Sequence, residues 1–443
     1  MTPAVAASRA PPYPPAAVTV IFAAVPASRL PATRSCLPPA DTAMRSARFP
    51  RLSPVVLAAL LAAPPTAAQA PAATQPAVPP LSVSGVVFGS YNYQLATTPA
   101  QLTNQIDNGF IIDRAYLNFR APAGDRLSVR LTTDVYQTSE TNAQIAYTIR
   151  AKYAYLQYDV PRSASGSGMF ARLGILQTVV IEHIESFWPR YLSQTALERA
   201  GYFASADVGL AAGVALPNRM GEVYATIVNG PGFTSRERDR FKDYAIRLSL
   251  TPLVARTEQP LLQNFTLTGW GYKGALASTF VNGGVGQTGP VGESLDRSRA
   301  GVFIGIRDPR LVLGGELAFR HDEVDAGANT ALAPRTESGA TGRLLSGLTQ
   351  VRPFAFTNGT GRSPFGLVAR YDRVSPSIST TNVATPPATA NSYHNLIAGM
   401  FYDVNQRAQF ALDYQESLAA SNDLSNAPPV QSKGYFLHFV VNF

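Results

Sequence analysis

The sequence has few charged residues and no long hydrophobic run beyond residue 70. Only 15% of its 443 residues are charged, whereas about 25% is usual in a soluble domain. After residue 70, no uninterrupted apolar stretch approaches the roughly 20 residues that a membrane-spanning helix needs. A membrane protein that lacks such helices must be a closed β-barrel, because lipid cannot pair the open edge of a sheet.

Cysteine and lysine are also scarce. The single cysteine, Cys36, lies in a segment that we expect to be absent from the mature protein, which excludes disulfides and thiolate metal sites there. Six of the 37 basic residues and one of the 29 acidic residues fall within residues 1–70, so the remainder has a formal charge of only +3. Nothing in this charge balance indicates nucleic-acid binding. The only lysines are Lys152, Lys242, Lys273 and Lys433.

Residues 44–70 have the three parts of a secretory signal peptide. Met44 opens a basic stretch with three arginines, an apolar segment (VVLAALLAA) covers 55–63, and Ala-Gln-Ala at 68–70 fits the cleavage pattern. The apolar segment is too short to span a bilayer. We therefore expect export from the cytoplasm and a mature chain that starts near Pro71.

The segments that flank the signal are expected to lie outside the folded domain. Residues 1–43 are rich in Ala and Pro, and we interpret them as a non-native upstream extension, with Met44 as the true start. A genuine cytoplasmic extension is the alternative. Residues 71–80 (PAATQPAVPP) predict a flexible periplasmic lead-in, which leaves 81–443 as the barrel.

Residues 81–443 predict an all-β fold, a transmembrane antiparallel β-barrel of about sixteen strands. Alternate residues of a strand share one face, and alternating apolar and polar segments recur along the whole region. Short periplasmic turns separate them in alternation with long extracellular loops, which is typical of outer-membrane barrels and not of soluble sandwiches. Sixteen strands enclose an aqueous lumen. The predicted strands cover 81–95, 112–121, 128–135, 147–159, 169–177, 205–216, 221–229, 243–252, 263–273, 299–308, 310–321, 343–354, 364–374, 392–404, 407–417 and 433–443.

The last strand has an apolar, aromatic face that ends in a C-terminal Phe. This face resembles the closing strand of bacterial outer-membrane barrels, whose ending the barrel assembly machinery reads. An amphipathic strand of a soluble protein is the alternative for this segment alone. We expect the strand to pair with the first strand near 83–93, leaving no open edge. The residues of this predicted assembly signal are Tyr435, Leu437, Phe439, Val441 and Phe443.

Several short motifs, in collinear order, resemble the phosphate-selective porin O/P family of Gram-negative bacteria. They are RLGILQ at 172–177, LERA at 197–200, SADVG at 205–209, YATIVNGPG at 224–232, ELAFR at 316–320, LSG at 345–347, RP at 352–353 and NQRAQFALDY at 405–414. The resemblance implies a sixteen-stranded, homotrimeric diffusion channel in the outer membrane, surrounded by lipid and lipopolysaccharide. The phosphate-selective members rely on constriction lysines, and here Gln177 stands where such a strand often ends in Lys, so the resemblance does not by itself imply phosphate.

Alternation places five arginines on the face toward the lumen. Charges that line a narrow water path attract counter-ions, and Arg binds oxyanions with two hydrogen bonds. We therefore expect neutral substitution of Arg130 and Arg320 to reduce any anion preference. Asp134, Glu316, Asp372 and Asp413 share the inward face, so a balanced, non-selective lumen stays open as an alternative. The predicted pore-lining residues are Arg114, Arg130, Arg247, Arg320 and Arg370.

The segment 179–204 is the predicted constriction loop. It is long, follows the fifth strand, and has helix-compatible stretches on both sides of Trp188-Pro189. The family's third loop folds inward at this point. Three carboxylates oppose the two arginines, which argues against a strongly anion-selective eyelet. As an alternative role, Glu198 and Arg199 tie the loop to the wall by a structural ion pair. The predicted eyelet residues are Glu182, His183, Glu185, Arg190, Glu198 and Arg199.

The sequence gives no support for an enzyme. Its four histidines in the barrel region lie in separate segments, without a nucleophile motif or metal-ligand spacing beside them, and no metal or other cofactor is expected. The predicted function is passive diffusion of small hydrophilic solutes through an outer-membrane porin, with a mild preference for anions, phosphate included. The alternative is a structural or adhesive barrel with an occluded lumen.

Overall fold

The computed structural model describes most of the chain from residue 81 onward. The described residues are 81–95, 108–139, 145–161, 163–164, 166–237, 240–277, 294–325, 337–358, 361–381, 392–419 and 432–443. The predicted upstream extension, signal peptide and periplasmic lead-in lie outside these ranges.

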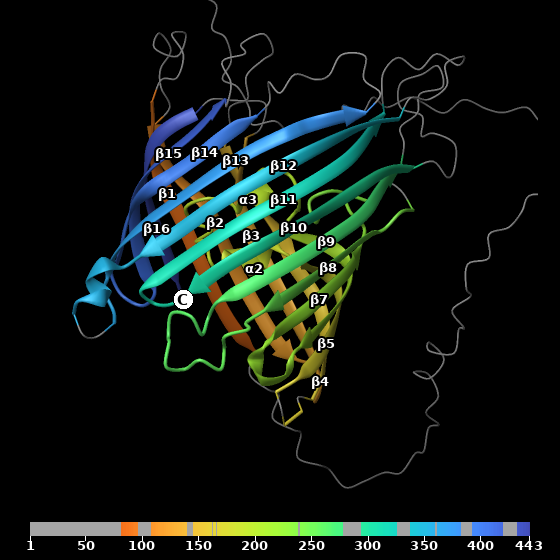
Figure 1. Cartoon of the computed structure of the whole chain (residues 1–443), viewed down its shortest axis with the longest axis horizontal. Coiled ribbons are helices and arrows are strands. Elements are labelled where there is room, and N and C mark those ends of the chain that lie inside the picture. Colours follow the sequence, from red (N-terminus) through yellow and green to blue (C-terminus); the bar gives the residue numbers. More distant parts are fainter. Residues whose placement is uncertain are drawn as a thin grey trace, which may run out of the picture. The chain divides into compact units, whose positions relative to one another are not determined.

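Sixteen strands form a closed antiparallel barrel, which confirms the predicted fold (Figure 1). Each strand pairs with its neighbours in sequence, and β1 pairs with β16 to close the sheet. The strands are β1 (Ser82–Leu95), β2 (Asn108–Pro122), β3 (Leu127–Ser139), β4 (Ile145–Val160), β5 (Gly168–Gln177), β6 (Ala206–Ala215), β7 (Gly221–Val228), β8 (Asp243–Leu250), β9 (Thr266–Ala277), β10 (Ser294–Arg307), β11 (Leu311–Asp325), β12 (Glu337–Val351), β13 (Phe365–Thr381), β14 (Tyr393–Asp403), β15 (Ala408–Ala419) and β16 (Ser432–Asn442).

Some strands extend beyond their predicted ends at the rim that carries the long loops. The polar end of β13, Ser375–Thr381, was not predicted as strand because its sequence lacks alternating apolar residues. It still pairs with β12, for example Thr381 with Gly339. Backbone hydrogen bonds between neighbouring strands need no apolar face, so pairing continues where the alternation has stopped.

The outer surface of the barrel is apolar. Large hydrophobic side chains alternate with inward-facing ones along the strands and remain exposed, which suits a surface in contact with lipid. The face of β16 that was predicted as the assembly signal belongs to this surface. Tyr435, Leu437, Val441 and Phe443 are 41% to 55% exposed, and Phe439 on the same face is partly exposed.

Two glycines of β1 make room for aromatic rings of the closing strand. A Cβ atom at Gly85 would lie 2.3 Å from Cζ of Phe443, and one at Gly89 would lie 2.9 Å from Cε1 of Phe439. The backbone of Phe443 continues the pairing, since its N–H donates to the Gly85 carbonyl at 3.0 Å and its carbonyl accepts from the Gly85 N–H at 2.9 Å. At the seam between the first and last strands, the ring of Phe443 therefore packs directly on the backbone of Gly85, and the ring of Phe439 packs on that of Gly89.

The connections differ between the two rims of the barrel. At the turn rim most are short, such as the turn through η3 (Pro217–Arg219) between β6 and β7. Two connections there, 251–265 and 352–364, are longer, and the second contains η4 (Pro353–Phe356). None of the helices in the described part of the chain is long and apolar enough to cross a membrane.

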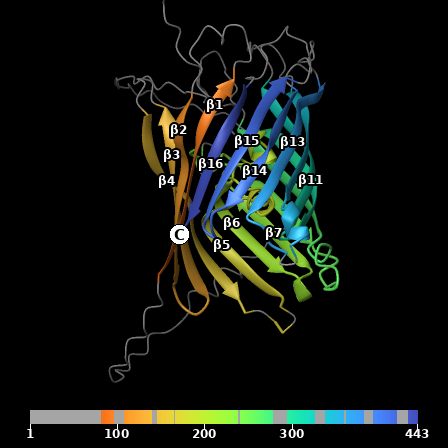
Figure 2. The same cartoon turned by 90° about the vertical axis from the view of Figure 1, so that its left-hand side faces the viewer.

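One connection from the long-loop rim enters the barrel. Residues 178–205, between β5 and β6, contain the short helices α2 (Ile181–Glu185) and α3 (Ala196–Arg199). Both helices lie within the ring of strands, as the two views in Figures 1 and 2 show. We call residues 178–205 the lumen loop. It includes all six residues predicted to form an eyelet.

Candidate constriction of the barrel lumen

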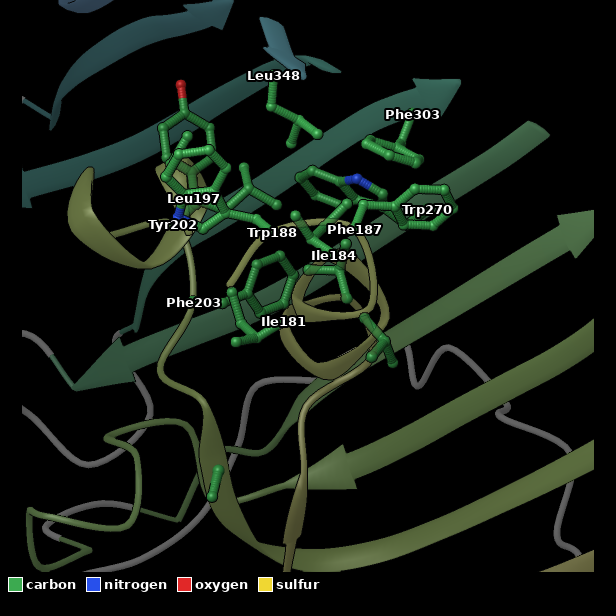
Figure 3. Close-up of a cluster of buried hydrophobic side chains, with 14 of the residues drawn as sticks. Ile181, Ile184, Phe187, Trp188, Leu197, Tyr202, Phe203, Trp270, Phe303 and Leu348 are labelled. Carbon is green, nitrogen blue, oxygen red and sulfur yellow. The ribbon is translucent and has the colours of Figure 1, made fainter. Parts of the chain in front are cut away.

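One side of the lumen loop is apolar and packs against the inner wall. Ile181 and Ile184 lie one helical turn apart, and Phe187 and Trp188 follow about one turn later, so these side chains share a face. They meet Trp270, Phe303 and Leu348 from β9, β10 and β12 (Figure 3). This packing holds the loop against one part of the wall and leaves its polar side toward the opposite strands.

Wall side chains also bind the backbone of the loop. Seven of them donate to loop carbonyl oxygens, most of which have no partner within a helix. The pairs are Arg247 with Val179 (2.8 Å), Arg307 with Ser186 (3.3 Å), Gln350 with Phe187 (2.9 Å), Gln415 with Leu192 (3.0 Å), Arg370 with Gln194 (2.7 Å), Arg320 with Ala200 (3.1 Å) and Arg299 with Tyr202. Buried carbonyls need such donors, so these wall residues hold the loop in place.

Three of the five predicted pore-lining arginines are therefore engaged in holding the loop. Arg370 faces inward but is only 2% exposed. It pairs with Asp372 at 3.0 Å and lies over the Trp188 ring at 4.6 Å. Arg247 is also covered by the loop and pairs with Glu222. Arg320 is partly exposed and lies over the Tyr202 ring at 5.2 Å.

The other two predicted pore-lining arginines lie on the wall opposite the packed side of the loop. Arg114 pairs with Asp134 at 3.0 Å, and Asp134 also binds Arg150 at 2.8 Å. Arg130 lies over the Tyr153 ring at 4.6 Å and is 3.8 Å from Glu182 of the loop. Both side chains line cavities in the lumen.

Arg190 connects the lumen loop to the opposite wall. Its guanidinium pairs with Glu185, and with Glu198 at 2.7 Å, while its Nε donates to the Tyr116 hydroxyl of β2 at 3.2 Å. Burial lowers the pKa of Arg190, but the two carboxylates raise it more, so the pKa lies well above its ordinary value. Among the described residues, the ion-pair partner of Glu198 is thus Arg190 of the same loop and not a wall residue.

One cavity lies on each side of Arg190 and its partners. The upper chamber, about 400 Å³, opens toward the long-loop rim and includes Gly230 and Phe233 of the connection after β7. The lower chamber, about 290 Å³, extends toward the turn rim and includes Asn118 and Arg130. Three residues line both chambers: Tyr116, Lys152 and Arg190. They mark the narrow point between the two cavities.

Comparison with known proteins establishes the fold. No protein-family model matches the chain, and no curated protein matches its sequence. Solved structures do match over 82% of the chain. The outer-membrane channel DcaP of Acinetobacter baumannii has a TM-score of 0.52 at 11% identity, with 97% of that chain covered. OmpF of Salmonella typhi, solved with daunomycin, also has a TM-score of 0.52, at 13% identity and 97% coverage. The anion-selective porin of Comamonas acidovorans has a TM-score of 0.51 at 10% identity and 99% coverage.

The chain has the fold of an outer-membrane porin. At these identities the likeness concerns the fold alone, and it does not single out the phosphate-selective O/P family.

Within this porin fold, Lys152 is the constriction residue that alternation did not predict. β4 carries a β-bulge, because Thr132 pairs with Tyr153 while Thr133 pairs with Ala151. The extra residue is Lys152, and a bulge lets two consecutive side chains face the same side. Lys152 and Tyr153 are accordingly both buried in the lumen, each 4% exposed. A single additional residue in the pairing gave no signal in the sequence pattern.

The ammonium group of Lys152 contacts two aromatic rings. Its Nζ lies 4.4 Å from the centroid of Tyr116 and 5.4 Å from that of Tyr153. Within the described ranges, no carboxylate forms an ion pair with it. Cation–π contacts hold a buried ammonium without cancelling its charge. Lys152 thus adds a positive charge where the two chambers meet.

Two predicted eyelet residues lie on the wall side of the lumen loop. The His183 Nε2 lies 2.9 Å from the Thr268 hydroxyl, and the ring packs edge-on against Phe187 and Phe303. Burial, with the nearby charges of Arg247 and Arg307, lowers the pKa of His183 to about 3. It is therefore uncharged at neutral pH. Arg199 lies near Arg370 and Asp372, and burial lowers its pKa.

The geometry offers no metal centre in the part of the barrel that is described. No group of three or more His, Asp or Glu side chains there is arranged to hold a metal ion. The shortest His–carboxylate contact, between His438 Nε2 and Asp413 Oδ2 at 3.0 Å, joins two neighbouring wall strands.

Proposed function

We propose that the protein is an outer-membrane porin for passive diffusion of small hydrophilic solutes, with a preference for anions. The observation that carries this proposal is the pair of chambers that share Tyr116, Lys152 and Arg190. Solutes would enter the upper chamber, pass these three side chains, and leave through the lower chamber. The barrel fold and its apolar outer surface support a path of this kind across a membrane.

The charges at the shared residues support anion preference. Arg190 is paired with two carboxylates, Glu185 and Glu198, which more than offset its single charge, so the proposed preference depends on Lys152. Lys152 has only rings around its ammonium among the contacts described. An uncompensated charge beside a narrow, low-dielectric path concentrates ions of the opposite sign. Phosphate belongs to the class of anions that such a site admits.

Planar-bilayer recording tests the proposal directly. Pure refolded protein should give stepwise conductance increments in KCl, and a KCl gradient should give a reversal potential of the sign expected for chloride preference. Added phosphate should compete with chloride and reduce the current. An absence of steps would favour the alternative of an occluded structural or adhesive barrel, and a cation-selective reversal potential would refute the anion preference.

We also propose that the protein is exported by the signal at 44–70 and assembles in the Gram-negative outer membrane as a homotrimer. The apolar β16 face supports recognition by the barrel assembly machinery. The girdle of exposed apolar and aromatic side chains supports contact with lipid and lipopolysaccharide. Sequencing the amino terminus of the membrane form should give a start near Pro71, and cross-linking in intact membranes should give a trimer. A dimer or monomer would overturn the trimer.

A further inference from the structure

We infer that the lower chamber favours anions that carry an aromatic ring, aromatic carboxylates being the simplest class. The inference rests on the proposed channel function and names the solutes that its narrow part would prefer. Its basis is the combination of cations and aromatic rings around one small cavity. A constriction that selected solutes only by charge and size would not require aromatic rings.

Four rings line the lower chamber. Phe88, Tyr116 and Tyr153 come from three different strands, and Tyr191 comes from the lumen loop. All four are more than nine-tenths buried, so the surrounding wall and loop restrict their movement. Phe88 and Tyr116 already contact each other, with centroids 5.9 Å apart and planes tilted by 55°. Offset and tilted geometries of this kind are those that aromatic rings prefer with each other.

The aliphatic part of the chamber adds to this apolar surface. Val86 of β1 and Val440 of β16 line it beside the rings. The volume of about 290 Å³ is close to the lower limit, roughly 300 Å³, of cavities that hold small organic molecules. A single-ring solute in this space must therefore touch the rings.

The charge of the chamber is positive on balance. Arg130, Lys152 and Arg190 line it together with Glu182 and Glu185. Glu185 is paired with Arg190, and Glu182 is half exposed and 3.8 Å from Arg130. Lys152 remains as the cation that a solute carboxylate can approach. Its Nζ lies within 5.4 Å of the centroids of both the Tyr116 and the Tyr153 ring, so a carboxylate bound there has its own ring near them.

Competition between carboxylates in planar bilayers tests this inference. Chloride current through the full-length mature channel is measured while sodium benzoate, cyclohexanecarboxylate or acetate is added, and the half-blocking concentration of each is compared. Ring–ring contact contributes about 1 kcal/mol, which is about fivefold in affinity. We expect benzoate to block at about fivefold lower concentration than either of the other two.

Substitutions test the contribution of the aromatic rings separately from that of the lysine charge. Tyr153→Leu and, independently, Phe88→Leu should bring the benzoate and cyclohexanecarboxylate values together, and Lys152→Met should weaken block by all three carboxylates. Tyr244→Leu, which removes an outward-facing ring that is 55% exposed, is the matched control and should change neither. Heat-modifiable migration in gels confirms that each variant has folded.

The outcomes are distinguishable. Equal block by benzoate and cyclohexanecarboxylate in the wild-type channel overturns the aromatic preference while leaving the porin function intact. Equal values for all three carboxylates do the same. A preference for benzoate that survives both ring substitutions also refutes the lower chamber as its source. If the protein forms no channels, the proposed function fails, and this inference with it.

Discussion

The ammonium of Lys152 lies 4.4 Å from the centroid of the Tyr116 ring. The two residues belong to β4 and β2, with β3 between them, so they meet only because both side chains point into the lumen. Such a contact holds the ammonium in place by its attraction to the ring face and leaves the charge available to ions. Paired with a carboxylate instead, the same lysine would contribute little field to the path.

Lys152→Met should reduce anion preference. The change removes the cation without an ion-pair partner among the described residues at the junction of the chambers while keeping most of the length of the side chain. We expect the chloride-to-potassium permeability ratio, from reversal potentials in a KCl gradient, to fall roughly two- to tenfold. Lys273→Met is the control, because Lys273 is largely exposed and pairs with Asp296 at 2.6 Å. Identical reversal potentials in both variants would show that Lys152 does not determine selectivity.

Arg320→Met should increase the mobility of the lumen loop. The substitution removes the donor to the Ala200 carbonyl and the contact with the Tyr202 ring, which costs about 1–2 kcal/mol of loop anchoring. We expect greater open-channel current noise with a small change in selectivity. Arg373→Met, at an exposed arginine of β13, is the control. A loss of anion preference without added noise would instead support the pore-lining role predicted from alternation.

Gly89→Val should impair barrel closure. A Cβ atom there would lie 2.3 Å from the Ile111 carbonyl oxygen and 2.9 Å from the Phe439 ring, so backbone at the seam must shift, at a cost of about 1–3 kcal/mol or more. The fraction of heat-modifiable, folded protein in membranes should fall. Gly109→Val is the matched control, because nothing lies within 4 Å of a Cβ at that position. Equal folded fractions in the two variants would show that the seam tolerates a side chain at position 89.

Deletion of Phe443 should reduce assembly more than conduction. The deletion removes both hydrogen bonds to Gly85 and the ring that covers it. We expect lower outer-membrane levels, measured by immunoblot, while the channels that do assemble keep wild-type conductance. Phe354→Ala, at an exposed phenylalanine of η4, controls for the loss of an aromatic side chain. Wild-type membrane levels after the deletion would refute the predicted assembly signal.

Acidification should destabilise the protein partly through His183. Its pKa is about 3 in the folded protein, against about 6.5 in an unfolded chain. Below pH 6.5 the unfolded state takes up a proton that the folded state does not, so this contribution to stability is lost progressively as the pH falls from 6.5 toward 3. In detergent, His183→Asn should show a smaller decrease in melting temperature over this range. An unchanged pH dependence would rule out His183 as a source.

The alternation of apolar and polar residues predicted the barrel strands well, because contact with lipid requires this alternation. β6 was predicted at 205–216 and occurs at Ala206–Ala215, since each strand must present apolar residues to lipid at every second position. The same rule gave the inward direction of Arg114, Arg130, Arg247, Arg320 and Arg370. It could not give their partners, because a period of two fixes a face and not what lies opposite it.

The constriction was harder to predict for two physical reasons. The bulge at Lys152 adds one residue to β4 and reverses which positions face inward, and no residue type marks it. The roles of Arg247, Arg320 and Arg370 depend on carbonyl oxygens of the lumen loop, which every residue possesses. A backbone acceptor leaves no trace in a sequence, so the anchoring of the loop became apparent only in three dimensions.

Pairing of β1 with β16 also determines when folding can finish. The first strand must wait for the last to be synthesised and delivered, and in the meantime each presents an unpaired row of backbone groups. Contacts between such distant residues form slowly, because a long loop must close before they stabilise anything. Closure therefore cannot occur before the last strand is available, and the seam between Gly85 and Phe443 is where a competing strand would cause misassembly.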